Sequence, residues 1–216
     1  MVTTKKQCMI IGASPLANGK IFDEFNPSDY FVICADGGYA TAQKYNIKVD
    51  CTVGDFDSLG EVPTDKNVTV LPTEKDVTDT MYAVMLALKN GYEHFVLIGC
   101  LSGHREDHSI ANYNVLLYLA NKSVFAVMAN EHTKVFVLKN CKLRVTKQKN
   151  SILSVFPFAC SECNVSYSGL KYPMKNETLL AGGEIMGVSN EIISDEASVT
   201  IHNGNALVII YTENNF

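Results

Sequence analysis

The feature that most constrains this fold is a series of short, largely apolar runs spaced through the first 130 residues. The runs occupy residues 8–11, 30–35, 51–53, 68–71, 94–98 and 124–128. Stretches with helical periodicity lie between them, at residues 39–45, 78–89 and 107–120. Continuous apolar strands that alternate with helices are typical of a parallel sheet covered on both faces. The pattern therefore predicts an α/β N-terminal domain with a mostly parallel sheet, whose ligands bind at the carboxyl ends of the strands.

The pattern changes after residue 130. Short alternating or β-branched runs follow at residues 134–138, 143–146, 152–156, 164–167, 199–202 and 207–211. Gly, Asn and Ser residues separate these runs, and none of them has a helical period. This predicts an all-β C-terminal domain of the sandwich or jelly-roll-like kind. We therefore expect two domains, residues 1–130 and 131–216.

The composition limits the classes of partner. The chain has 216 residues, of which 47% are hydrophobic, and its formal net charge of -5 argues against nucleic-acid binding through a basic face. No segment approaches the roughly 18 apolar residues that span a bilayer, and residues 8–13 are too short for a signal-peptide core. The seven cysteines suit reduced thiols, and the Cys-x-x-Cys at 160–163 lacks the second pair that a zinc site needs. We expect a cytoplasmic protein without a membrane partner.

Two carboxylates one residue apart follow the third apolar run. In an extended or tightly turned backbone, alternate side chains point the same way, so Asp55 and Asp57 would present both carboxylates to one point while Phe56 turns inward. Such a pair suits Mg²⁺, which prefers oxygen ligands and leaves positions for water and phosphates. The alternative is a surface turn in which both Asp side chains cap backbone groups.

Other charged residues also fall where predicted strands pass into helices. Asp36 begins an Asp-Gly-Gly turn whose glycines allow close approach of the backbone, although such turns are also common structural elements. Asp76 and Asp79 open the next predicted helix, either as ligands or as caps of its free amide groups.

The segment after the fifth run adds three candidates. Arg105 offers a planar fork suited to phosphate oxygens, and Asp107 could cap the following helix. His108 is a candidate for nucleotide binding, with a polar niche on the helix as the alternative.

Six carboxylates share one predicted rim of the sheet. They are Asp36, Asp55, Asp57, Asp76, Asp79 and Asp107. Because like charges repel unless cations neutralise them, the cluster implies a divalent metal, and metal together with Lys75 and Arg105 implies a polyphosphate. Both glycine-rich nucleotide signatures are absent, so the phosphates would be held mainly through metal. We interpret the chain as a nucleotide-dependent transferase.

The motifs that contain these residues resemble those of thiamine pyrophosphokinase. They are DGG (36–38), GDFDS (54–58), KDxTD (75–79), GxRxDHxxAN (103–112), GLKY (169–172) and GVSNE (187–191), in an order that covers nearly the whole chain. The resemblance implies Mg²⁺-dependent transfer of a pyrophosphoryl group from ATP to the hydroxyl of thiamine, which gives thiamine diphosphate and AMP. It also implies an α/β nucleotide domain, a β domain that binds thiamine, and a homodimer with thiamine between its subunits.

The resemblance also implies roles for individual residues. Metal and phosphates would be held by the catalytic residues Asp55, Asp57, Asp76 and Asp79, and one carboxylate, of which Asp79 is a candidate, would accept the hydroxyl proton. The nucleotide site would be completed by Asp36, Lys75, Arg105, Asp107 and His108, and the thiamine pocket would be lined by Ser189 and Asn190. In two departures, His104 replaces a glycine that is usual in bacterial relatives, and the chain has no Trp to stack on thiamine, for which Tyr172 is the candidate substitute.

Three other functions fit parts of the pattern. A nucleotide-sugar glycosyltransferase also uses an Asp-x-Asp metal site, but it leaves the KDxTD and DH segments unexplained. A haloacid-dehalogenase-like phosphatase needs Asp-x-Asp-x-[Thr/Val] after its first strand, whereas Ser58 follows the pair here and two runs precede it. A non-catalytic sensor of thiamine or nucleotide has no need for so costly a cluster of charge.

Overall fold

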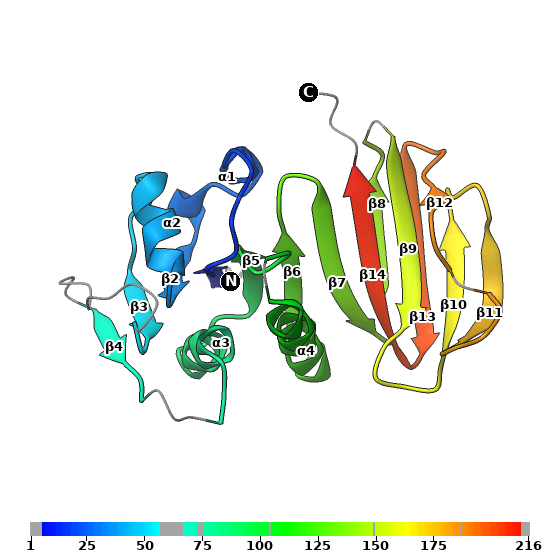
Figure 1. The fold of residues 1–216 in the computed structure, drawn as a ribbon. Helices are drawn as coiled ribbons and strands as arrows, with labels where there is room; N and C mark the ends of the chain where they lie inside the picture. The colour runs from blue at the N-terminus through cyan, green and yellow to red at the C-terminus, as the bar shows by residue number, and fades with distance from the viewer. Residues whose placement is uncertain are drawn as a thin grey trace, which may run out of the picture. The chain divides into compact units, whose positions relative to one another are not determined.

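The computed structural model describes residues 6–56, 67–72, 76–103, 105–148, 150–185 and 187–212. The chain divides into two compact units, residues 1–131 and 132–216. The first unit combines helices with a parallel sheet, and the second contains antiparallel strands (Figure 1). The predicted fold class, an α/β domain followed by an all-β sandwich, is therefore confirmed.

No helix in the described ranges has both the length and the apolar character needed to cross a membrane.

The first unit alternates strands and helices along the chain. Its elements are β1 (Gln7–Ile11), α1 (Ile21–Glu24), the 3-10 helix η1 (Pro27–Asp29), β2 (Phe31–Ala35), α2 (Gly38–Lys44), β3 (Cys51–Gly54), β4 (Val68–Val70), α3 (Asp79–Lys89), β5 (His94–Ile98), α4 (Glu106–Asn121) and β6 (Phe125–Ala129). The three helical stretches expected from the sequence correspond to α2, α3 and α4. The elements α1 and η1 were not expected, because four and three residues are too few to show a period.

The described strands of the first unit form a parallel sheet in the order β6-β5-β1-β2-β3-β4. β1 lies inside this sheet, where Met9 pairs with Val32 of β2 on one side and with Val96 of β5 on the other. After its first residue, each of β1, β2 and β5 is buried throughout, as expected for strands covered on both faces. Helices α3 and α4 contact each other and lie side by side in Figure 1. Since parallel strands all end at the same edge, the loops that follow them gather there.

The second unit is built from strands in the described part of the chain. They are β7 (Thr133–Lys139), β8 (Lys142–Thr146), β9 (Ser151–Pro157), β10 (Glu162–Ser168), β11 (Met174–Leu180), β12 (Asn190–Glu191), β13 (Glu196–Asn203) and β14 (Asn205–Thr212). The order β12-β9-β14-β7 forms one antiparallel layer, and β11-β10-β13-β8 forms the other. Contacts of β10 with β14 and of β13 with β7 join the two layers into a sandwich.

Burial in the sandwich follows the alternation seen in the sequence. In β9, Leu153 and Val155 are buried while Ser154 between them is half-buried, and in β10 the buried residues include Val165 and Tyr167. The strand β11 was not expected from the sequence. Its residues MKNETLL are mostly exposed, because it lies at the edge of its layer and has little apolar alternation to detect.

The parallel sheet gives a direct test of core packing. Phe95 of β5 is 0% exposed, whereas Phe125 of the neighbouring β6 is 48% exposed. Phe95→Ala should lower the free energy of unfolding by about 3–5 kcal/mol, because it removes buried apolar surface and leaves a cavity. The matched control Phe125→Ala should cost less than about 1 kcal/mol. Urea unfolding followed by circular dichroism measures both changes, and similar losses in the two variants would contradict the assignment of the core.

Candidate active site

A hollow of about 390 Å³ lies where several strands of the first unit end. Its lining comes from the segments after β1, β2, β3 and β5, from the start of α3 and from α4. The lining residues are Ala13, Ser14, Ala35, Asp36, Asp55, Asp76, Val77, Thr78, Asp79, Thr80, Gly99, His108 and Asn112. Residues far apart in the sequence, among them four carboxylates, therefore meet at the carboxyl edge of the parallel sheet.

Asp36 is placed by a tight turn directly after β2. Its backbone has a positive φ of 46°, and its N–H donates to the carbonyl oxygen of Val53 in the neighbouring β3 at 2.8 Å. Gly38 follows at the start of α2, where a Cβ atom would lie only 1.9 Å from the carbonyl oxygen of Ile11. Glycine is required at position 38 because no larger residue fits against the end of β1.

Asp55 lies directly beyond β3 and lines the hollow. The strand ends in a hydrogen bond from the N–H of Leu71 to the carbonyl oxygen of Gly54, at 2.8 Å. Phe56 has a positive φ of 59° and is only 2% exposed, so it turns inward as expected. Asp57 lies outside the described residues.

The carboxylates at the start of α3 share the hollow with a threonine cap. Thr78 is the N-cap residue, and its Oγ1 accepts the N–H of Met81 at 3.2 Å. Asp79 is the first residue of the helix, where the helix dipole favours a negative charge. Asp76 and Asp79 both line the hollow, while Lys75 lies outside the described residues. The sequence allowed Asp76 and Asp79 as caps of this helix. In the structure the hydroxyl of Thr78 supplies the side-chain cap.

Arg105 and Asp107 form a pair with each other and do not line the hollow. Arg105 Nε donates to Asp107 Oδ1 at 3.0 Å, a second guanidinium nitrogen donates to Oδ2, and both side chains are mostly exposed. The hydrogen bond from Arg105 lowers the pKa of Asp107 to about 2. Asp107 lies in the first turn of α4 and not at its N-cap, which is Arg105. In this structure the planar fork of Arg105 is therefore engaged by a carboxylate.

His108 and Asn112 reach the hollow from α4. The side chain of Asn112 is buried, and its Nδ2 donates to the carbonyl oxygen of Cys100 at 2.8 Å, which ties the helix to the end of β5. Sequence reasoning placed His108 here but did not select Asn112, Thr80 or Ser14. The signal for Ser14 was available, because it follows the first apolar run as Asp36 follows the second.

The two residues selected in the second unit differ in their surroundings. Asn190 is buried and lines a hollow of about 240 Å³. Its side chain accepts the N–H of Tyr172 at 2.9 Å and donates to the carbonyl oxygen of Tyr172 at 2.8 Å. Ser189 is exposed with a φ of 54°, and its N–H donates to Ser154 Oγ at 3.0 Å. Asn190 thus fixes the turn that carries Tyr172, while Ser189 is not among the residues that line this hollow.

The hollow in the second unit is mostly apolar. Besides Asn190, it is lined by Leu153, Val155, Tyr167, Tyr172, Met174, Ile185, Gly187 and Val188. Within the described residues, the buried hydroxyl of Tyr167 has no hydrogen-bond partner. Burial raises the pKa of Tyr167 above its usual value, so the hydroxyl is a neutral hydrogen-bonding group at this site. A mostly apolar hollow with few polar groups in its lining suits a small organic ligand.

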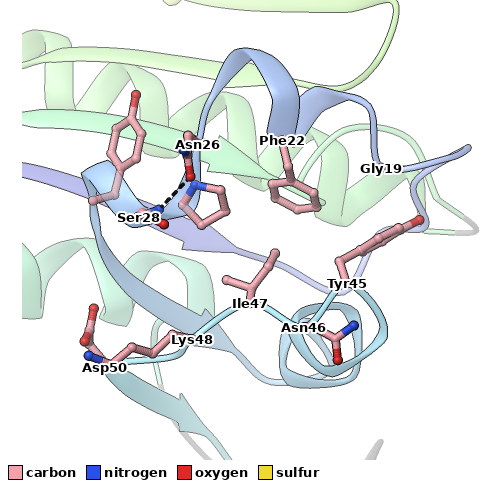
Figure 2. A pocket seen from close by; sticks show the side chains of 11 residues that line it. Gly19, Phe22, Asn26, Ser28, Tyr45, Asn46, Ile47, Lys48 and Asp50 are labelled. Atoms are coloured by element: carbon pink, nitrogen blue, oxygen red, sulfur yellow. Dashed lines mark hydrogen bonds between the residues drawn. The ribbon is translucent and has the colours of Figure 1, made fainter.

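A larger hollow, of about 660 Å³, has different chemistry (Figure 2). It is lined by residues that precede β2 and β3, so it lies toward the amino-terminal ends of these strands. Its lining holds a single carboxylate, that of Asp50, which accepts the N–H of Val32 at 2.9 Å, and its Asn26 side chain accepts the N–H of Ser28 at 3.0 Å. We therefore assign the active site to the smaller hollow with the converging carboxylates.

The donor set of that site fits Mg²⁺ when substrate oxygens complete it. Its carboxylates are hard oxygen ligands, and no cysteine lines the hollow. Among the described residues, no group of three His, Cys, Asp or Glu side chains is arranged to hold a metal ion by itself. Mg²⁺ is commonly bound by one or two carboxylates together with water and phosphates, and that pattern needs no protein cage.

Two family models match the sequence. The model described as "Thiamin pyrophosphokinase, catalytic domain" matches residues 22–129. The model described as "Thiamin pyrophosphokinase, vitamin B1 binding domain" matches residues 140–208. A comparison with curated proteins finds no match.

Solved structures of thiamin pyrophosphokinases are similar to this chain over nearly its whole length. The Bacillus subtilis structure has a TM-score of 0.84 at 21% identity, covering 97% of this chain and 100% of that chain. For the Candida albicans structure the TM-score is 0.78 at 15% identity, with coverage of 97% and 90%. For the yeast structure it is 0.74 at 14% identity, with coverage of 96% and 86%. These likenesses show a common fold, and the two family models together match most of the sequence. The chain belongs to the thiamin pyrophosphokinase family and is a thiamine diphosphokinase.

Proposed function

We propose that this enzyme transfers a pyrophosphoryl group from ATP to the hydroxyl of thiamine with Mg²⁺, giving thiamine diphosphate and AMP. The observation that supports the proposal most is the convergence of Asp36, Asp55, Asp76 and Asp79 on one hollow at the carboxyl edge of the sheet. In a member of this family, such a concentration of carboxylates suits a site for metal and phosphates.

The residues of the chain divide into two proposed roles. The catalytic carboxylates Asp55, Asp57, Asp76 and Asp79 would hold Mg²⁺, which when bound supplies positive charge against the phosphate oxygens. The nucleotide would be bound by Asp36, Lys75, Arg105, Asp107 and His108. Arg105 can present the fork formed by its Nε and Nη2 to a phosphate only if its pairing with Asp107 opens, because both nitrogens are engaged there.

The protein contributes to the reaction mainly by positioning and by accepting a proton. Holding the thiamine hydroxyl close to the nucleotide makes the attack effectively unimolecular. Asp79 is our candidate for the general base, because it lines the hollow from the first turn of a helix and is within the acidic cluster.

Thiamine would be held in the second unit by Ser189, Asn190 and the aromatic side chain of Tyr172. Asn190 fixes the backbone of Tyr172 through two hydrogen bonds, and Tyr172 is 62% exposed beside an apolar hollow. A cationic heteroaromatic ring is attracted to the face of an exposed tyrosine. Tyr172 would thus take the stacking role for which this chain has no tryptophan.

The reaction products test which group is transferred. With ATP, Mg²⁺ and thiamine, the enzyme should release AMP and thiamine diphosphate in equal amounts, and it should release no AMP when thiamine is omitted. Chromatographic separation of nucleotides and thiamine esters measures both products. If ADP and thiamine monophosphate appear instead, the proposed reaction is wrong.

The metal-binding role of Asp55 has a separate test. Asp55→Asn should lower kcat/KM by about 100-fold or more, because metal-held charge stabilisation contributes several kcal/mol. Its melting temperature without metal should not fall, since removing one of several like charges relieves repulsion. The control Asp29→Asn changes an exposed carboxylate of η1 outside the hollow and should leave kcat/KM unchanged. Early melting of Asp55→Asn with retained activity would show that Asp55 belongs to a structural turn.

We also propose that the enzyme is a homodimer that uses an apolar surface of the second unit. Tyr172, Ile185 and Val188 are 62%, 62% and 51% exposed, although side chains of this kind are usually buried. Wild-type protein should therefore sediment with the mass of two chains, and Ile185→Asp with Val188→Asp should sediment as one. Ile110→Asp, which changes an apolar side chain of α4 that is 59% exposed, is the matched control and should stay dimeric. Dimers of the double variant would contradict this choice of surface.

We place the enzyme in the cytoplasm. All seven cysteines are free thiols in the structure, and six of them are buried or partly buried. Free thiols in this number are usual where the compartment is reducing, which supports that location.

A further inference from the structure

The segment between β1 and α1, residues 12–20, forms part of the wall of the active-site hollow. Ala13 and Ser14 line the hollow. The segment is attached at this end to the neighbouring strand, since Gly12 N–H donates to the carbonyl oxygen of Ile98 and Ser14 N–H donates to that of Gly99, each at 2.8 Å. These two hydrogen bonds hold only the end of the segment at residues 12–14, so the conformation of the remaining residues up to position 20 needs a separate attachment.

The other end of the segment is held by the carboxylate of Glu131, which follows β6. Glu131 Oε1 accepts the backbone N–H of Asn18 at 3.0 Å and that of Gly19 at 2.8 Å. Burial by itself would raise the pKa of Glu131, but the backbone N–H groups of the segment lower it below its usual value. The acceptor is therefore an ionised carboxylate, and hydrogen bonds of this kind are stronger than those between neutral groups.

Gly19 is also confined on a second side. Its φ is +77°, and a Cβ atom there would lie 2.3 Å from Cε1 of Tyr45, so the Tyr45 ring occupies the space beside it (Figure 2). The carboxylate of Glu131 and the ring of Tyr45 together leave Gly19 little freedom to move. The segment is thus fixed both at Ser14, where it meets the hollow, and at Gly19.

We propose that Glu131 is a positioning residue for the reaction. By accepting the backbone N–H groups of Asn18 and Gly19, it keeps residues 12–20 in the conformation that holds Ala13 and Ser14 against the nucleotide. Glu131 is not among the residues that line the hollow, so it acts through the segment and not by contact with the substrate. This inference rests on the proposed function, because it takes the hollow to be the nucleotide site.

The first test separates positioning from general stability. Glu131→Ala should raise the KM for ATP about tenfold, as expected if the segment adopts its competent conformation about one tenth of the time, and should change kcat by less than about twofold. Glu131→Gln should restore most of the affinity, because its amide oxygen can accept the same two N–H groups.

The matched control is Asp50→Ala. It also removes a carboxylate that accepts a backbone N–H, that of Val32 at 2.9 Å, but Asp50 precedes β3 and is outside the active-site hollow. This variant should melt earlier than the wild type and keep its KM for ATP. An unchanged KM for ATP in folded Glu131→Ala would overturn the proposal, as would an equal rise in Asp50→Ala.

A second measurement needs no turnover. Hydrogen exchange of the free protein should be faster at the amides of residues 14–19 other than Pro15, which has no N–H, in Glu131→Ala, and close to wild type there in Asp50→Ala. If Glu131→Ala does not fold, Gly19→Ala replaces it, because the added Cβ displaces the same point of the segment. Unchanged exchange at residues 14–19 would overturn the proposal. If the wild type does not consume ATP, the proposed function fails by itself, and the exchange data still decide whether Glu131 holds the segment.

Discussion

Burial of the parallel sheet on both faces is the constraint on which the rest of this structure depends. Because β1, β2 and β5 are buried throughout after their first residues, their faces have no room for polar side chains. Polar side chains can therefore be placed only after the last residue of each strand, and parallel strands end at the same edge of the sheet. Asp36 follows β2 and Asp55 follows β3, so both reach one hollow without any strand having to carry a buried charge.

Gathering several carboxylates at that edge costs free energy, and the fold offsets this cost only in part. Like charges repel, and a carboxylate in a hollow loses some of its hydration. Helix α3 places Asp79 in its first turn, where the helix dipole is favourable, and leaves the side-chain cap to Thr78. Asp107 is paired with Arg105 outside the hollow. Bound cations would offset the remaining charge, which is why the site suits Mg²⁺ and phosphates better than a neutral substrate alone. Because the chain belongs to the thiamin pyrophosphokinase family, this assignment takes the place of the glycosyltransferase, phosphatase and sensor interpretations.

The sequence predicted most of the fold because its strongest signals are local. Helices α2, α3 and α4 and the buried strands were visible as periods and apolar runs, whereas α1, η1 and the two-residue β12 are too short to show either. The edge strand β11 has mostly exposed residues, so its pairing with β10 and not its composition defines it. Among the candidate site residues, Asp36, Asp55, Asp76, Asp79 and His108 line one hollow, while Asp57 and Lys75 lie outside the described residues.

The sequence by itself determined the two kinds of domain, the family and the edge of the sheet at which the acidic residues lie. These follow from periodicity and ordered motifs, which a single chain displays in its residue order. Only the tertiary structure decided which of these side chains face the hollow and which bind each other, as Arg105 and Asp107 do. It also decided that Asn190 holds Tyr172 and that Glu131 holds a segment more than 100 residues before it. Such contacts depend on the directions of side chains in the folded chain, and residue order does not specify those directions.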